Sequence, residues 1–192
     1  MYNISTSSKT ALLIAALSTG ILFSNATLAG SDKPNKVSPG KPGEVTIVDA
    51  ALATPDFSSL VGAILCFGPP EDNPIIDLLS GEDNYTVFAP NNAAFDAFLG
   101  TTDPCTLDST LLFTVLAYHV TDGRRFANSV FNLNNPKMIE MLAGGYIVTM
   151  PSFTIHTNAE QPAVGLGALI NFNASNGVIH EINAVMDPRP AD

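Results

Sequence analysis

The side chains that could do acid–base or metal chemistry are spaced in this chain in a way that argues against a catalytic site. The three histidines are far apart, at His119, His156 and His180. They form no H-x₃-H or HExxH pair, and there is no C-x₂-C, G-x-S-x-G or phosphate-binding glycine loop. Adjacent acids such as Glu71 and Asp72 fall in polar segments, where a solvated role is the simpler interpretation. The sequence therefore predicts a non-catalytic protein without cofactor or metal, although a site assembled from scattered residues stays open.

The two cysteines, Cys66 and Cys105, are the other reactive pair. In an exported protein, an even number of cysteines favours a disulfide, whereas two buried free thiols are the alternative. A bridge would close a loop of about 40 residues and stabilise the fold by roughly 3–4 kcal/mol in the chain-entropy model.

The predicted secondary structure that positions these residues changes along the chain, from mainly helices in the first half to strands in the second. The first half predicts short helices with recognisable caps, over residues 46–52, 54–65 and 75–79 and after Asn91 and Asp108 or Ser109, around one strand at 85–89. The second half predicts strands at 146–150, 153–156, 168–172 and 177–186, separated by Gly, Pro and Asn. Helices followed by a run of strands indicate an α+β domain.

Alternation within the last predicted strand assigns its histidine to the core. Val178, His180 and Ile182 share one face, and Glu181 and Asn183 share the other. His180 is therefore predicted to be a hydrogen-bonded core histidine, with a ligand or catalytic role as the alternative. Glu181 is predicted to face away from that core.

The N-terminus predicts export. Residues 1–29 combine Lys9, an apolar run of about 13 residues that is too short to span a bilayer, and small residues before Gly30, as in a signal peptide. An uncleaved anchor helix is the alternative. Because the junction has no cysteine, a lipid anchor is not expected. Residues 30–44 read as a flexible Pro/Gly/Lys leader, 45–188 as one domain and 189–192 as a short tail. We expect a secreted or periplasmic protein without a further membrane span.

Charge narrows the choice of partners. Removal of residues 1–29 leaves 7 basic against 18 acidic residues, a formal charge of −11. Nucleic acids and anionic membrane surfaces both reward basic patches, so neither is an expected partner.

Four segments in this order resemble a fasciclin domain. They are residues 46–52, the segment TVFAPNNAAF at 86–95, the Tyr-His segment at 116–124, and NGVIHEI at 176–182. The resemblance covers residues 45–188 and implies an α+β fold, a wedge-shaped β-sandwich flanked by short helices.

The family also implies binding rather than catalysis. In animal relatives the Tyr-His region, here Tyr118 and His119, is linked to adhesion, which makes these two residues candidates for partner binding at a cell surface or matrix. The alternative is that both pack inside the fold. The acidic motif of some animal members is absent from residues 169–173, which disfavours an integrin-type partner. A protein or polysaccharide partner is expected, and a carrier of a small apolar ligand, such as a carotenoid or lipid, is the rival hypothesis.

Overall fold

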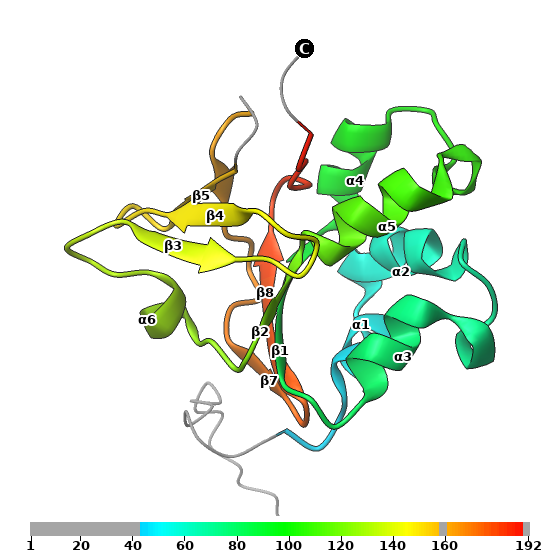
Figure 1. The fold of residues 1–192 in the computed structure, drawn as a ribbon, viewed down its shortest axis with the longest axis horizontal. Helices are drawn as coiled ribbons and strands as arrows, with labels where there is room; N and C mark the ends of the chain where they lie inside the picture. The colour runs from blue at the N-terminus through cyan, green and yellow to red at the C-terminus, as the bar shows by residue number, and fades with distance from the viewer. Residues whose placement is uncertain (1–42, 158–160, 190–192) are drawn as a thin grey trace, which may run out of the picture. The chain divides into compact units, whose positions relative to one another are not determined.

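The structure is a computed structural model that describes residues 43–157 and 161–189 (Figure 1). The expected signal peptide, most of the leader and the last tail residues lie outside this range, so those assignments stay predictions. Across the described residues, no individual helix is both long and apolar enough to cross a membrane. One pair of segments, Ile47–Ala53 and Pro55–Leu65, meets that test only when taken together, and it is bent by 101°.

The helices begin where the sequence supplies caps. Thr46 forms a capping box with Asp49, and the side chains of Asn91 and Asp108 accept hydrogen bonds from the first turns of the helices that follow them. The helices are α1 (Ile47–Ala53), α2 (Ser58–Leu65), α3 (Pro74–Ser80), α4 (Asn92–Leu99), α5 (Ser109–Ala117) and α6 (Ala127–Val130), with 3₁₀ turns η1 (Pro55–Phe57), η2 (Pro70–Asp72) and η3 (Pro104–Thr106).

The strands form two four-stranded sheets. The first has the order β2 (Val120–Asp122), β1 (Tyr85–Pro90), β8 (Gly177–Ile182) and β7 (Phe172–Ala174). The second has the order β3 (Lys137–Glu140), β4 (Tyr146–Thr149), β5 (Thr154–His156) and β6 (Val164–Gly165). Strands β1 and β8 run parallel at the centre of the first sheet, and the other pairings are antiparallel.

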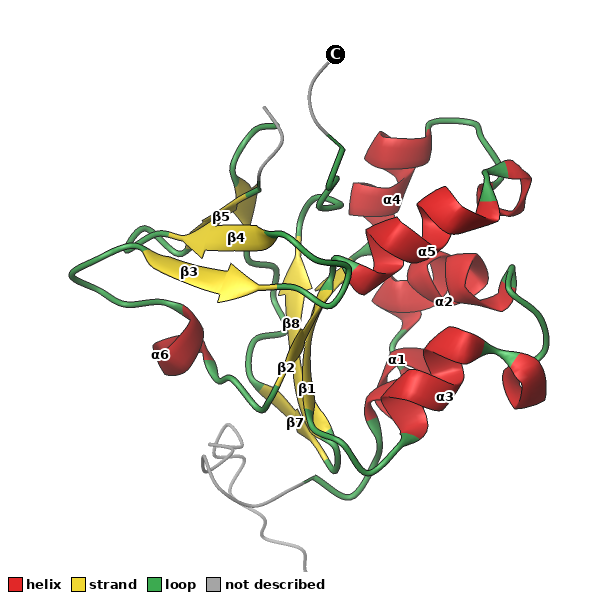
Figure 2. Ribbon diagram, in the orientation of Figure 1, coloured by secondary structure: helices red, strands yellow, loops and turns green. Residues whose placement is uncertain are grey.

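The first sheet is covered on both faces. Figure 2 shows helices α1 to α5 on one side of it and the second sheet on the other. Val87 and Ile179 belong to the core cluster beneath the helices, whereas Phe88 and Ile182 belong to the cluster toward the second sheet. Every residue of β1 and β8 is consequently buried. The α+β prediction is confirmed by this arrangement of helices and two sheets.

Several details of the strand prediction are wrong. Residues 168–171 form no strand, and β7 begins only at Phe172. The sequence predicted no strand at the positions of β2, β3 or β6. Glu181 is buried rather than exposed, because β8 is covered on both faces and its alternation does not separate core from solvent.

Candidate functional site

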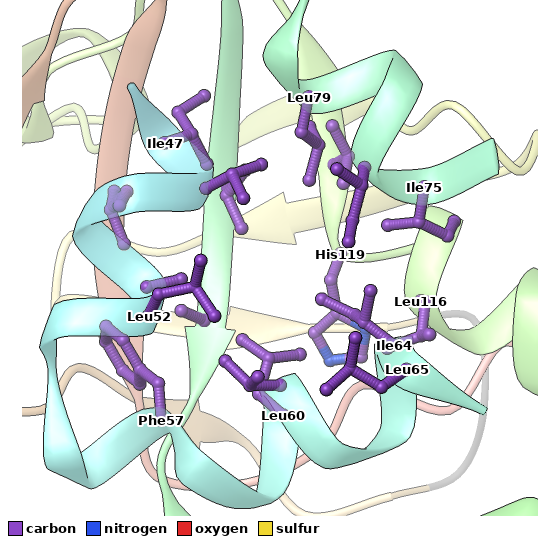
Figure 3. A pocket seen from close by; sticks show the side chains of 18 of the residues that line it. Ile47, Leu52, Phe57, Leu60, Ile64, Leu65, Ile75, Leu79, Leu116 and His119 are labelled. Carbon is purple, nitrogen blue, oxygen red and sulfur yellow. The ribbon is translucent and has the colours of Figure 1, made fainter. Parts of the chain in front are cut away.

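An apolar pocket opens in the helical layer, between α1, α2 and α3 and the first sheet (Figure 3). Its cavity volume is about 100 Å³. The buried side chains of Val87 and Ile179 line it from the sheet. Leu52 and Leu65, which are 60% and 42% exposed, line it from α1 and α2. The lining is hydrocarbon except for one polar side chain, that of His119.

The helical periodicity of one segment creates much of this wall. Phe57, Leu60, Val61, Ile64 and Leu65 recur at the spacing of a single helical face, and all five line the pocket. The sequence predicted their shared face. It did not predict a cavity beneath it, because a cavity depends on how the three helices meet the sheet.

His119 is held in one neutral form by its two neighbours. Its Nδ1 lies 2.6 Å from the carbonyl oxygen of Val115, to which it donates, and its Nε2 accepts the backbone N–H of Met186 at 2.8 Å. A proton on Nε2 would face another N–H, so the site suits only the Nδ1–H tautomer. Burial lowers the pKa of His119 to about 4, and the bond to Val115 opposes that shift only in part.

Tyr118 lies beside His119 in sequence but points into the cluster toward the second sheet. Its hydroxyl donates to the carbonyl oxygen of Tyr146 at 2.8 Å. Tyr118 is 0% exposed and His119 is 2% exposed. Neither side chain forms part of the exposed surface, although His119 lines the pocket, and the two residues tie α5 to different parts of the core.

His180 has the same kind of environment on the opposite face of the first sheet. Its Nε2 donates to the carbonyl oxygen of Arg125 at 2.8 Å, and its Nδ1 accepts from the N–H of Asn171 at 3.4 Å. The ring stacks on Phe88, with centroids 5.8 Å apart. Burial lowers the pKa of His180, so it too is a neutral core residue, as the alternation predicted.

Glu181 is the structural residue that sequence reasoning missed. It is 6% exposed, and its two carboxylate oxygens accept from the side-chain amide of Asn91 and from the N–H of Leu169, each at 2.9 Å. Asn91 also caps α4, so Glu181 links β8 to the helical layer. The parallel pairing of β1 with β8 would have given the signal, since a strand paired on both edges and packed on both faces has no solvent side.

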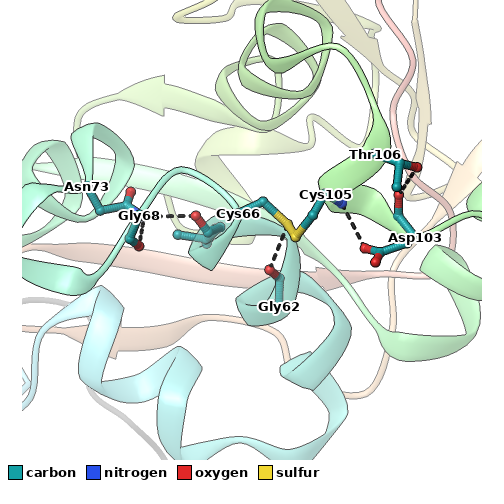
Figure 4. The surroundings of a disulfide bond; sticks show 8 residues. Gly62, Cys66, Gly68, Asn73, Asp103, Cys105 and Thr106 are labelled. Atoms are coloured by element: carbon teal, nitrogen blue, oxygen red, sulfur yellow. Dashed lines mark hydrogen bonds between the residues drawn. A yellow bond between two sulfur atoms is a disulfide. The ribbon is translucent and has the colours of Figure 1, made fainter.

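The two cysteines are joined in a disulfide, the pairing that the sequence favoured (Figure 4). It connects the end of α2 to η3, with the Cα atoms 5.0 Å apart. Asp103 caps η3 by accepting the N–H of Cys105 at 2.9 Å. The bridge lies outside both sheets and restrains the helical layer that contains the pocket.

The described residues offer little for metal or acid–base chemistry. Within residues 43–157 and 161–189, no group of three or more His, Cys, Asp or Glu side chains is placed to hold a metal ion. Every buried side-chain nitrogen or oxygen atom in the same range has a hydrogen-bond partner. The arrangement can hold an apolar group in the pocket, and its buried polar atoms are occupied within the fold.

The environment of His119 predicts a loss of stability in acid. The unfolded ring takes up a proton near pH 6.5, whereas the folded ring does so only near pH 4. Between these values the unfolded state binds more protons than the folded state. The free energy of unfolding therefore falls as the pH is lowered from 6.5 to 4, by up to about 3 kcal/mol. His119→Gln should be less stable at pH 7 but should have a flatter profile between pH 6.5 and 4, measured by urea unfolding.

Two comparisons complete that experiment. His156 is exposed, so His156→Gln is the matched control for the loss of stability that His119→Gln causes at pH 7. His180→Gln should flatten the profile in the same direction as His119→Gln, because burial lowers both pKa values. An unchanged slope in His119→Gln would show that the ring is not kept neutral by the fold.

Comparison with known proteins identifies a matching family model and a solved structure with a similar fold. The model of the fasciclin domain matches residues 55–188. A solved structure described as a FAS1 domain pair from the insect cell adhesion molecule fasciclin I has a TM-score of 0.56 at 11% identity, and covers 74% of this chain and 51% of that one. Helix α1 precedes the matched range but contributes Ile47 and Ala50 to the same core.

Proteins with similar sequences match this chain over different fractions of their own lengths. Protein sll1483 of Synechocystis is 32% identical over 149 residues, which is 75% of this chain and 74% of that protein. Transforming growth factor-beta-induced protein ig-h3 of Sus scrofa is 31% identical over 74% of this chain but only 19% of its own length. Cell surface glycolipoprotein MPB83 of Mycobacterium bovis is 40% identical over 79 residues, 41% of this chain and 35% of that protein. The family model and the Synechocystis relative together establish that this chain belongs to the fasciclin domain family.

Proposed function

We propose that this chain is an exported, non-catalytic binding protein that attaches to a protein or polysaccharide at a cell surface or in a matrix. One observation carries the proposal. The polar residues of the family motifs, Tyr118, His119 and His180, are buried and bonded to backbone groups, so they maintain the fold. What remains for function is the surface of a stable domain, which suits recognition better than bond-making.

The names of two similar proteins support attachment. One relative is described as a cell surface glycolipoprotein, and the solved structure comes from a cell adhesion molecule. The predicted signal peptide is consistent with a similar location for this chain, and its acidic composition suits a soluble, exported domain.

A retention assay tests the proposal directly. Fluorescently labelled mature protein should be retained on cell envelopes or matrix polymers from its native host, and unlabelled protein should compete for the same sites. An unrelated acidic protein of similar size, labelled in the same way, gives the control for non-specific retention. Loss of retention by folded protein on every such surface would contradict attachment.

The apolar pocket favours a second candidate, a carrier of a small apolar ligand. Its lining is almost wholly hydrocarbon, and a cavity of this kind can hold an apolar guest. A volume of about 100 Å³ accommodates only part of a long polyene or lipid, so a carrier would need the helices α1 to α3 to separate. Protein purified from the native host should then release an extractable chromophore or lipid, and ligand-free protein would exclude this role.

A further inference from the structure

Charge is divided unevenly between the two parts of this domain. Between Gly43 and Gly123, which includes α1 to α5, the sequence has twelve of the 18 acidic residues and no Lys or Arg. From Arg124 to Arg189 the described residues include all four described bases and three acids, Glu140, Glu181 and Asp187. The helical layer, which holds the pocket, is therefore the strongly negative part of the domain.

Several of these acids adjoin residues that line the pocket. Asp49 follows Val48 in α1, and Asp56 precedes Phe57 in η1. Glu71 follows Pro70 in η2, and Asp77 follows Ile76 in α3. All four acids are exposed, and no base in residues 43–123 offsets them. An apolar hollow is thus bounded by elements that carry only negative charge.

The size of the hollow selects the kind of group it can take. An engineered apolar cavity of about 150 Å³ binds benzene, so a cavity of about 100 Å³ suits one aliphatic or aromatic side chain. Leu52 and Leu65 extend apolar surface outward from it. A single anchor residue inserted into such a pocket is the typical centre of a protein interface, and surrounding charges of opposite sign speed association and select the partner.

We propose that this pocket binds a basic segment of a partner protein, with one Leu, Ile or Phe side chain inserted and Lys or Arg side chains beside it facing the acidic elements. The inference rests on the proposed binding function and gives it a site and a partner chemistry. A neutral lipid or polyene could fill the apolar pocket but has no positive charge to pair with the surrounding acidic residues. A polysaccharide without apolar groups would leave the pocket empty.

A short synthetic peptide with a central phenylalanine between lysines is the probe. Titration into the isotopically labelled mature protein should shift the backbone amide signals of pocket residues such as Leu52, Ile64 and Leu65. Replacing the phenylalanine by serine should weaken binding at least about tenfold, as loss of a buried anchor does. Replacing the lysines by glutamate should abolish binding. Raising the salt concentration from about 0.1 M to about 1 M should weaken binding of the lysine peptide, since the attraction between its lysines and the acidic residues is then screened within a few ångströms.

Matched protein variants separate local charge from net charge. Asp56→Asn combined with Asp77→Asn should weaken the lysine peptide about fivefold, because both acids are exposed and directly adjacent in sequence to residues that line the pocket. Asp96→Asn combined with Glu140→Gln removes the same charge from exposed sites on α4 and β3 and should leave binding unchanged. Circular dichroism and the midpoint of unfolding confirm that each variant is folded.

The possible results distinguish failure of the pocket proposal from failure of the attachment proposal. Binding that survives loss of the phenylalanine, shifts that map to the second sheet, or equal binding of lysine and glutamate peptides would each overturn the proposal, as would tighter binding of a neutral lipid. Peptide binding as described, without retention on any cell envelope or matrix, would support the pocket and contradict attachment. Retention that the phenylalanine peptide does not compete for would support attachment and contradict the pocket as its site.

Discussion

Replacing Gly177 with alanine is expected to lower the free energy of unfolding by about 3 kcal/mol, because the added methyl group has no space. Gly177 begins β8 and pairs with Tyr85 of β1. A Cβ atom there would lie 2.1 Å from the carbonyl oxygen of Tyr85 and 2.5 Å from the side chain of Ile47. The side chain could move, but the carbonyl belongs to the central parallel pair of the sheet. Denaturant unfolding measures the loss.

The same substitution at Gly62 should have the opposite sign. Gly62 lies within α2 and is exposed, and a Cβ atom there would meet nothing within 4 Å. Alanine restricts the unfolded chain and favours helix, so Gly62→Ala should stabilise the protein by about 0.5–1 kcal/mol. Equal stability of Gly177→Ala and the parent protein would show that β1 and β8 are farther apart than the structure places them.

Loss of the disulfide is the second large effect. Cys66 and Cys105 are 39 residues apart, so the chain-entropy model gives a stabilisation of about 4 kcal/mol from restricting the unfolded chain. Replacing both cysteines with alanine should lower the free energy of unfolding by roughly that amount. The unfolding transition of the parent protein should move to lower denaturant concentration when a reductant is added.

The double alanine variant is also the control for that experiment. A reductant should leave its unfolding curve unchanged, because no bridge remains to break. If the parent protein were equally insensitive to a reductant that demonstrably frees both thiols, the bridge would contribute nothing to stability. Peptide binding to the pocket can be followed in the same variant, since α2 lines the pocket and ends at the bridge.

The local parts of this structure could be predicted from the sequence. Thr46, Asn91 and Asp108 cap helices because their side chains accept the backbone N–H three residues on, and such contacts depend only on the neighbouring chain. The apolar face from Phe57 to Leu65 follows from helical spacing in the same way. These interactions form within a few residues, so sequence order is sufficient to recognise them.

The short strands could not be predicted with the same security. Strand β2 has three residues and exists because β1 lies beside it, with Val120 opposite Val87. The interval from Ala168 was assigned to a strand for its composition, yet the pairing with β8 begins only at Phe172. A strand is defined by its hydrogen-bonded neighbour, and that neighbour is distant in sequence.

By itself, the sequence determined the family, the helix caps, the candidate disulfide and the core position of His180, because each depends on residue type and local spacing. The tertiary structure alone decided that Tyr118 and His119 face inward and that Glu181 is a buried link. It also decided that helices α1 to α3 leave an apolar pocket over the first sheet. Those features require the parallel pairing of β1 with β8 and the coverage of both sheet faces. The physical reason is that burial is a property of what packs against a residue, and for these residues the packing partners are distant in the chain.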